Sequence, residues 1–449
     1  MPSPDLVVRA RRAVLPGGTA PAVVTVRAGR IAAVDPHDAP VTGPVVDLAD
    51  DEVLLPGLVD THVHTAGEGF ATATRAAAAG GVTTLVDMPV RSPVLDPEAL
   101  AATRDAARDQ VAVDVAFWGA AVPLCDGVPD AAGRVDRGRL TALARAGVRG
   151  LVCHLADAGV PGFPPLGHED LELAAATCAE EGLPLLVHAE DDGVLSEAPP
   201  AGPDYRSFLA AHPPGAETTA VLRLAAVAGR TGARIHVLHV SAFEAAEEIG
   251  AARDAGARLT AETCPHHLAL AAESMAGTLG KCCPPVRSES NRELLWGALG
   301  AGRLDAVVSD HASWPPGARD GGFAAAATGV SSLEVALRVL WSGAAGRGHT
   351  LDDVAGWTAA APARLAGLDA KGAIAPGCDA DLVAFAPDEV AEVDPAALHH
   401  RHPGTPYDGM ALRGAVRRVW LRGTEAPGTG DGRLLPDGSR GPVRAVADS

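Results

Sequence analysis

The chain has 449 residues, of which 47% are apolar, so it can bury a large core and suits one large domain with a smaller one beside it. Its 37 basic and 56 acidic residues give a formal net charge of -19, which nucleic-acid phosphates and anionic membrane surfaces would repel. We therefore expect neither nucleic acid nor a membrane as a partner.

Residues 1–12 contain no apolar stretch of the about 7–15 residues that a signal peptide needs, and no run approaches the roughly 20 apolar residues of a membrane span. The seven cysteines have neither the spacing of a disulfide framework nor a CxxC zinc motif. We therefore expect a cytoplasmic protein with reduced thiols.

Short β-rich segments open and close the chain. They cover residues 5–9, 22–27, 30–34, 381–385 and 416–422, with Gly and Pro turns between neighbours. We expect the two ends to pair into a small β-sandwich domain made of residues 1–54 and 372–449.

Between these ends, apolar strand-like runs alternate with Ala-rich helical stretches, which is typical of parallel βα units. Eight strands are predicted, at residues 57–64, 82–88, 111–120, 150–155, 185–190, 235–241, 259–265 and 306–311. Helical spacing covers residues 69–79, 169–181, 218–228, 243–255 and 331–341. Eight such units predict an α/β fold with a (β/α)8 TIM barrel over residues 55–371. The longest connection, residues 191–216, follows the fifth strand and is the best candidate for a lid over the barrel mouth.

Polar side chains gather at the ends of the predicted strands. His62 and His64 are two residues apart on the first strand, so both can point into the barrel and share one metal. His188, His239 and Asp310 each follow an apolar run, at the fifth, sixth and eighth strands. Burying several imidazoles and a carboxylate at one barrel mouth is costly unless they hold a metal or form a hydrogen-bonded network.

Longer motifs carry a resemblance to a known family. They are Pro56-Gly-Leu-Val-Asp-Thr-His-Val-His64, residues 69–89, Glu262-Thr-Cys-Pro-His266, Lys281-Cys-Cys-Pro-Pro-Val-Arg287, Ser309-Asp-His311, residues 371–383 and Pro406-Tyr-Asp-Gly409. In these stretches the chain resembles the amidohydrolase superfamily, and within it the cyclic amidohydrolases: allantoinase, dihydropyrimidinase or hydantoinase, and dihydroorotase. Allantoinase-like proteins are the closest of these, and the resemblance covers essentially the whole chain.

The resemblance implies a metal site. In the family, two divalent metals are held by histidines of the first, fifth and sixth strands, by the aspartate of the eighth, and by a carboxylated lysine on the fourth. Carried over, the metal ligands are His62, His64, His188, His239 and Asp310, and zinc is the expected metal.

The resemblance also implies a reaction, the hydrolysis or the reverse closure of a C–N bond in a small cyclic amide or ureide. Asp310 and His239 would be catalytic, and Asp310 would pass a proton from water to the departing ring nitrogen. Cys283 and Pro284 would contact the substrate. The family resemblance further implies a homodimer or homotetramer.

Val152 departs from the family pattern. The bridging lysine should fall in Gly150-Leu-Val-Cys-His154, where the family reads Gly-Phe-Lys-Cys, and valine offers no ligand atom. Three outcomes stay open. One metal per chain, favoured over two, would be bound by His62, His64, His188 and Asp310, with His239 orienting the attacking water. Alternatively, His154 would supply a replacement ligand, and its other interpretation is a side chain packed under the substrate loop. Finally, the site would hold no metal, and the protein would be catalytically inactive or repurposed.

Further departures concern the substrate and leave rival functions open. Ala66 stands where dihydroorotases carry a substrate-binding arginine, and Arg91 stands where the family usually carries asparagine. Arg91 would either clamp a carboxylate or lie in a solvated loop. The cluster His399-His-Arg-His402 is interpreted as loop surface. The rivals to a cyclic amidohydrolase are a catalytically inactive binding protein of the same fold and a deaminase-type hydrolase with one metal.

Overall fold

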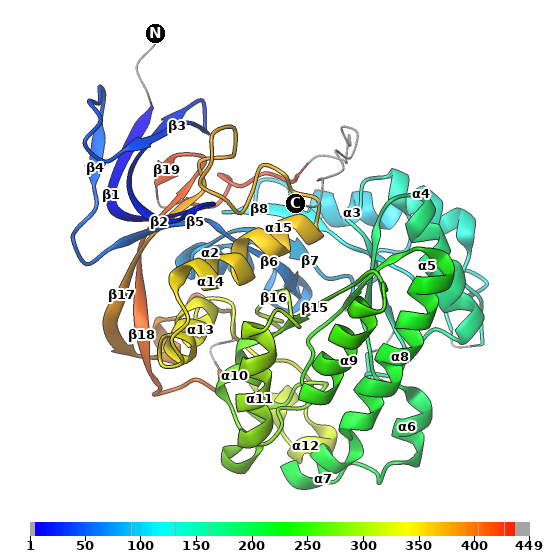
Figure 1. Ribbon diagram of the computed structural model, residues 1–449. Coiled ribbons are helices and arrows are strands. Elements are labelled where there is room, and N and C mark those ends of the chain that lie inside the picture. The colour runs from blue at the N-terminus through cyan, green and yellow to red at the C-terminus, as the bar shows by residue number, and fades with distance from the viewer. Residues whose placement is uncertain are drawn as a thin grey trace.

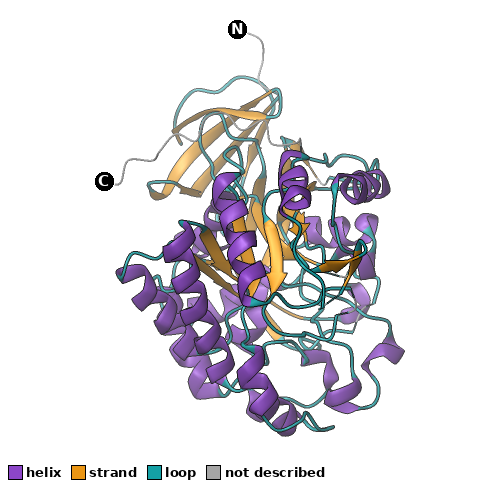
Figure 2. Ribbon diagram, turned by 90° about the vertical axis from the view of Figure 1, so that its right-hand side faces the viewer, coloured by secondary structure: helices purple, strands orange, loops and turns teal. Residues whose placement is uncertain are grey.

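The computed structural model describes residues 5–90, 92–130, 132–160, 162–402, 404–425 and 427–435. Parallel strands form a central barrel with helices around it, and a β-rich unit lies at one end (Figures 1 and 2). In Figure 1 the blue strands of the chain start and the orange strands of the chain end lie side by side in this unit. Both ends of the chain therefore build it, as predicted.

The β-rich unit is one eight-stranded sheet. Its strands are β1 (Leu6–Leu15), β2 (Gly18–Arg27), β3 (Arg30–Pro36), β4 (Val45–Asp47), β5 (Val53–Pro56), β17 (Leu382–Glu392), β18 (Ala411–Leu421) and β19 (Thr424–Glu425). They run in the order β19-β18-β17-β5-β1-β2-β3, and β4 pairs with β1. The antiparallel pairing of β17 with β5 joins the two chain ends, so the strands expected in a sandwich share one sheet. The division of the chain at residues 55 and 371 stays a prediction.

The barrel strands fall where the sequence predicts them. They are β6 (Leu58–Val63), β7 (Val82–Asp87), β8 (Asp114–Phe117) with β9 (Gly119–Ala120), β12 (Leu151–His154), β13 (Pro184–His188), β14 (Arg234–Val237), β15 (Leu259–Thr263) and β16 (Ala306–Val307). The last strand returns to the first because the Ser309 amide donates to Asp60 Oδ2 at 3.1 Å and the His64 amide donates to the His311 carbonyl at 2.9 Å. The predicted TIM barrel is confirmed.

Helices cover the outside of the barrel (Figure 2). They are α1 (Thr65–Glu68), α2 (Phe70–Ala79), α3 (Pro97–Ala107), α4 (Arg137–Arg145), α5 (His168–Glu180), α6 (Asp192–Glu197), α7 (Tyr205–Ala211), α8 (Pro214–Thr231), α9 (Phe243–Asp254), α10 (Pro265–Ala269), α11 (Glu289–Gly300), α12 (Gly322–Ala325), α13 (Ala336–Ala345), α14 (Leu351–Ala355) and α15 (Ala361–Leu365). A two-strand hairpin, β10 (Leu124–Cys125) with β11 (Val128–Pro129), lies between β9 and α4. No helix among the described residues is long and apolar enough to cross a membrane.

Local chemistry explains where several helices begin. Asp96 and Asp136 accept hydrogen bonds from the backbone amides three residues on and so cap α3 and α4. The helix predicted from residue 331 begins only at Ala336, because Ser332 Oγ donates to the Ser309 carbonyl at 2.8 Å and holds that segment against the barrel end.

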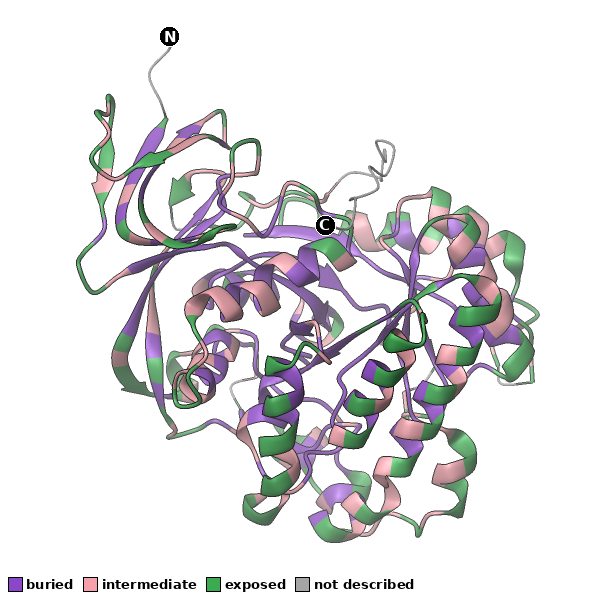
Figure 3. Ribbon diagram, in the orientation of Figure 1, coloured by how far each residue is buried: buried purple, intermediate pink, exposed green. Residues whose placement is uncertain are grey.

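The strands of the barrel wall are buried (Figure 3), and strand alternation separates their two faces. Leu151 and Cys153 of β12 pack outward in the core shared with the surrounding helices. Val152 packs inward with Val86, Trp118 and other apolar side chains and is fully buried. This inward layer packs below the polar strand ends, and buried His236 lies in register with it.

Lys371 ties the β-rich unit to the barrel. Its Nζ lies 2.6 Å from Asp114 of β8, 2.7 Å from Asp381 and 2.9 Å from Asp379, and its side chain is buried. Arg422 also pairs with Asp114. The three carboxylates therefore converge on a cation that the chain itself supplies.

Candidate metal centre and active site

A cavity of about 620 Å³ opens at the carboxyl ends of the barrel strands. The predicted site residues that line it are His62, His64, His154, His188, His239, Cys283 and Asp310. Pro284 is buried and is not among the lining residues, and Arg91 lies outside the residues that the structure describes. The structure therefore gathers the predicted histidines and the aspartate at one mouth.

His62, His64 and Asp310 form the tightest group. Asp310 Oδ1 lies 3.2 Å from His62 Nε2 and 3.4 Å from His64 Nε2, and all three side chains are buried. Two imidazoles and a carboxylate whose ligand atoms lie within 4.8 Å of one another match the donor set of a catalytic zinc site, in which three protein ligands leave a position open. The chemistry of these residues fits a divalent metal.

A buried carboxylate behind His62 fixes its position. Glu262 Oε1 lies 2.6 Å from His62 Nδ1, and Glu262 Oε2 lies 3.0 Å from His236 Nε2. Burial would lower the pKa of His62, but the charges of Asp310 and Glu262 and the hydrogen bond to Glu262 raise it to about 9. Burial opposes ionisation of Glu262 as well, yet the hydrogen bonds from His236 and His62 lower its pKa to about 2. Glu262 is therefore an ionised carboxylate that orients an imidazole of the site.

A second group lies around His188. His188 Nδ1 is 3.1 Å from His239 Nε2, and His188 Nε2 is 3.1 Å from Glu190 Oε2. Glu190 also lies 2.9 Å from His212 Nδ1 and accepts a 3.0 Å hydrogen bond from the Cys283 thiol. Despite complete burial, these hydrogen bonds hold the pKa of Glu190 well below its ordinary value. The structure places His188 between Glu190 and His239, outside the group of His62, His64 and Asp310.

His239 and Asp310 carry strained backbone. Their φ angles are 36° and 47°, in the left-handed region that side chains other than glycine rarely adopt. Such strain concentrates at functional sites, where the surrounding structure holds a side chain in a needed direction. Burial, together with the charge of His188, lowers the pKa of His239 to about 3, so its imidazole is neutral.

Val152 and His154 lie one above the other on the inner face of β12. Val152 pairs in register with Leu186 of β13, and His154 pairs with His188. Val152 belongs to the apolar layer below the cavity and His154 to the cavity wall. Valine at this position supplies no donor atom to either histidine group.

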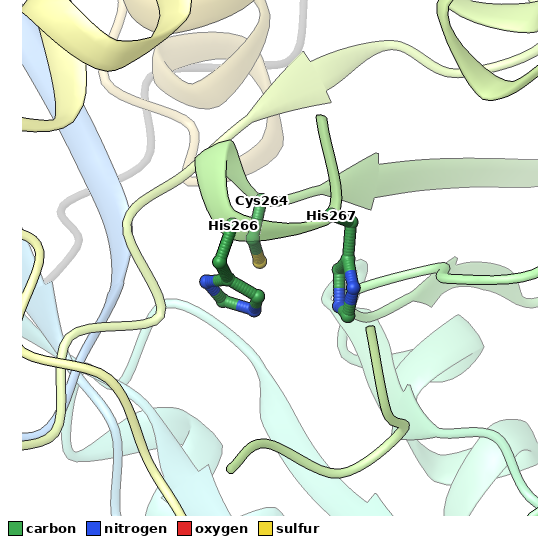
Figure 4. A group of neighbouring side chains, drawn as sticks. All are labelled: Cys264, His266 and His267. Carbon is green, nitrogen blue, oxygen red and sulfur yellow. The ribbon is translucent and has the colours of Figure 1, made fainter. Parts of the chain in front are cut away.

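A further buried cluster lies behind Asp310. Cys264, His266 and His267 gather at the start of α10 (Figure 4), and His266 Nε2 lies 4.0 Å from Asp310 Oδ2. Among the described residues, the ring nitrogens of these two histidines have no hydrogen-bond partner. Burial lowers the pKa of His266 to about 4. The imidazoles behind Asp310 are therefore neutral, and the negative charge of Asp310 is balanced by His62 and His64.

The segment predicted as a lid overhangs the mouth. Residues 191–216 contain α6 and α7, and they contribute Ala201, Phe208 and His212 to the cavity wall. Arg287 braces this segment, because its guanidinium donates to the His212 carbonyl at 3.1 Å and to Glu217 Oε1 at 2.6 Å.

The interpretation of the histidine cluster near the C-terminus is wrong for one member. His400 is buried, its ring lies 4.8 Å from that of His311, and its Nε2 accepts a hydrogen bond from the Glu334 amide at 3.3 Å. His311 in turn faces Glu68 at 3.3 Å. Contacts with His311 and Glu334 bury His400 at the barrel end. Local charge and composition do not reveal these contacts.

Comparison with known proteins identifies the family. The model of the amidohydrolase family matches residues 53–426. The chain belongs to the amidohydrolase family. It is 47% identical over 449 aligned residues to an allantoinase of Streptomyces avermitilis, covering 96% of this chain and 98% of that one, and 38% identical to an allantoinase of Saccharomyces cerevisiae, covering 82% of each.

Solved structures support the same assignment. An L-hydantoinase (dihydropyrimidinase) from Arthrobacter aurescens matches with a TM-score of 0.88 and 26% identity, covering 96% of this chain and 99% of that one. The resemblance to allantoinase-like amidohydrolases is thus confirmed. The amidohydrolase family implies a divalent metal, and the group of His62, His64 and Asp310 has the chemistry to hold it.

Four residues of this amidohydrolase site had no predicted role: Glu190, His212, His236 and Glu262. Glu190 lies two residues after His188 and Glu262 two after Thr260, and strand alternation alone would place each pair on one face. Strand alternation in the sequence therefore indicated the direction of the two carboxylates. His212 reaches the site from a loop, and nothing in its local sequence indicates that position.

Proposed function

We propose that the protein is a metal-dependent hydrolase that opens, or in reverse closes, a ring C–N bond in a small cyclic ureide, with allantoin as the leading candidate. The observation that carries this proposal is the buried group of His62, His64 and Asp310 at the base of the cavity. The allantoinases and the hydantoinase that the chain resembles support the class of substrate. One catalytic ion per chain is proposed, and zinc suits the nitrogen and oxygen donors.

A divalent metal bound by this group would lower the pKa of water toward about 7 and polarise the ring carbonyl. Asp310 faces the same space with an ionised carboxylate, since the charges of His62 and His64 and the hydrogen bond from His64 outweigh burial and hold its pKa well below the ordinary value. It accepts the proton of the attacking water and returns it to the departing ring nitrogen. Neutral His239 lines the same cavity.

The cavity wall suits a compact, uncharged ring. Met88, Val90, Leu238 and Phe208 contribute apolar surface, and Lys281 stands with its Nζ 5.1 Å from the centre of the Phe208 ring. Lys281 also donates a hydrogen bond to the Ala326 carbonyl. Among the described lining residues, few charges are thus left free to select an anionic substrate.

Two rivals are separated by one activity panel. Purified, zinc-loaded protein is offered allantoin, hydantoin and a dihydropyrimidine beside aminated heterocycles, and Asp310→Asn serves as the inactive control. Ring opening that falls by about 10²–10⁴-fold in Asp310→Asn supports the proposal. Release of ammonia from the aminated heterocycles alone would favour the deaminase, and no turnover of any compound would favour the inactive binding protein.

We further propose a cytoplasmic location and a homodimer or homotetramer. All seven cysteines are unpaired, which suits a reducing compartment. Size-exclusion chromatography with light scattering tests the assembly, and a monomer would contradict it.

A further inference from the structure

Two buried carboxylates each hold one histidine of the cavity in a fixed tautomer. Glu262 faces His62 Nδ1 at 2.6 Å, and Glu190 faces His188 Nε2 at 3.1 Å. When a metal displaces the proton of the other ring nitrogen, an imidazole that donates its N–H to a carboxylate presents a lone pair to that metal, and this is the usual way in which proteins present histidine to a metal. The cavity therefore holds two imidazoles, those of His62 and His188, that are oriented to bind a metal.

These imidazoles belong to different groups. The second ring nitrogen of His62, Nε2, lies 3.2 Å from Asp310, within the catalytic group. The free nitrogen of His188 lies 3.1 Å from His239 Nε2, and His239 Nδ1 has no hydrogen-bond partner in the described residues. His188 and His239 thus supply two nitrogen donors for a second metal site.

Two nitrogen donors are fewer than a protein zinc site requires, because catalytic and structural sites use three or four protein ligands. The residue that should complete the pair on β12 is Val152, whose side chain is buried in the apolar layer. The second site therefore lacks a ligand at Val152 and must take one from elsewhere.

His154 is the neighbour that can complete it. It pairs in register with His188 on the adjacent strand, and the two rings lie 4.8 Å apart. It is 4% exposed, and its Nδ1 has no hydrogen-bond partner in the part of the chain that the structure describes. Phe163 packs against the ring at 4.5 Å and holds it at the cavity wall. An orphaned, buried imidazole nitrogen beside the ring of His188 is the kind of donor that a metal satisfies.

We propose that His154, His188 and His239 form a second zinc site, in which His154 takes the place of the lysine that the family uses. Because His154 reaches the site from one layer above Val152, no group bridges the two metals. Glu190 acts as a positioning residue that fixes the tautomer of His188. The inference rests on the proposed metal dependence but not on the choice of substrate.

The test is a zinc titration of metal-free protein by calorimetry, with zinc content measured by plasma mass spectrometry. The wild type should bind two equivalents and His154→Phe one, since phenylalanine preserves the packing against Phe163 and removes the donor. His168→Phe, at an exposed histidine far from the cavity, is the matched control and should keep two. His62→Ala should keep the equivalent that His154→Phe loses.

A rescue and a second measurement protect the test against a folding defect. Val152→Lys combined with His154→Phe should regain the second equivalent when bicarbonate is supplied, because a carboxylated lysine then replaces the lost imidazole. X-ray absorption on zinc-loaded wild type should count five imidazoles over two zinc ions, and four would overturn the assignment of His154.

The outcomes separate this inference from the proposed function. Two equivalents retained in His154→Phe would overturn the second site alone. So would a wild type that opens the ring but binds a single equivalent, which His62→Ala removes. A wild type that binds no zinc would overturn both.

Discussion

Glu262 gives the sharpest prediction about the catalytic group. Its carboxylate is fully buried and accepts from His62 Nδ1 at 2.6 Å and from His236 Nε2 at 3.0 Å. Glu262→Gln keeps the volume and one acceptor but removes the charge. A hydrogen bond to a charged group is worth about 1.5–3 kcal/mol and a neutral one about 0.5–1.5 kcal/mol, so the change should cost about 1–1.5 kcal/mol at His62. Adding the loss at His236 brings the effect into the roughly 10–100-fold range found when the carboxylate behind a metal ligand is removed.

The assay is a competition between the protein and a chelator of known zinc affinity, read for wild type, Glu262→Gln and Glu98→Gln. Glu98 is exposed on α3 and controls for the loss of a carboxylate as such. Zinc affinity should fall by about 10–100-fold in Glu262→Gln and stay unchanged in Glu98→Gln. An affinity within about twofold of wild type in Glu262→Gln would refute the role given to this carboxylate.

Three further predictions concern stability and substrate binding. Lys371→Met leaves the buried Asp381 without its cation and Asp114 with Arg422 alone, and it should cost about 3–5 kcal/mol in urea unfolding. Burial already raises the pKa of Asp381, so this loss should shrink as the pH falls and the folded state takes up protons, and a loss that grows at low pH would contradict the sign. Removing zinc should destabilise wild type by about 2.7 kcal/mol relative to protein with zinc at a hundred times its Kd, and His62→Ala should show a clearly smaller difference in the same melting experiment. Phe208→Ala should raise KM several-fold with little change in kcat, because the ring lines the cavity without reaching the catalytic group, and an equal loss in kcat would place it in the chemistry.

Sequence reasoning predicted the fold because hydrophobic periodicity is a local property. The apolar runs at β6 to β16 and their spacing define parallel βα units, and the polar residues His62, His64 and Asp310 mark where strands end. Sequence order could not show that His188 would face Glu190 and His239 instead of the group at Asp310. That outcome depends on side-chain direction at two strand ends, which the period of a strand constrains but does not decide.

The remaining differences have similar causes. A buried polar residue on a connecting segment, such as His212 or His400, is placed by partners far away in the chain, and local composition predicts exposure for it. The helix predicted from residue 331 starts late because a serine hydroxyl bonds to the barrel end. Val152, in contrast, was informative in sequence alone, because the absence of a donor atom needs no structure to be recognised.

The account depends most on a metal held by His62, His64 and Asp310. Anomalous X-ray diffraction at the zinc edge, on crystals of zinc-loaded protein, locates the ion without reference to activity. An anomalous peak is expected about 2.0–2.2 Å from His62 Nε2, His64 Nε2 and a carboxylate oxygen of Asp310. Zinc-loaded crystals with no peak at these three residues would contradict it.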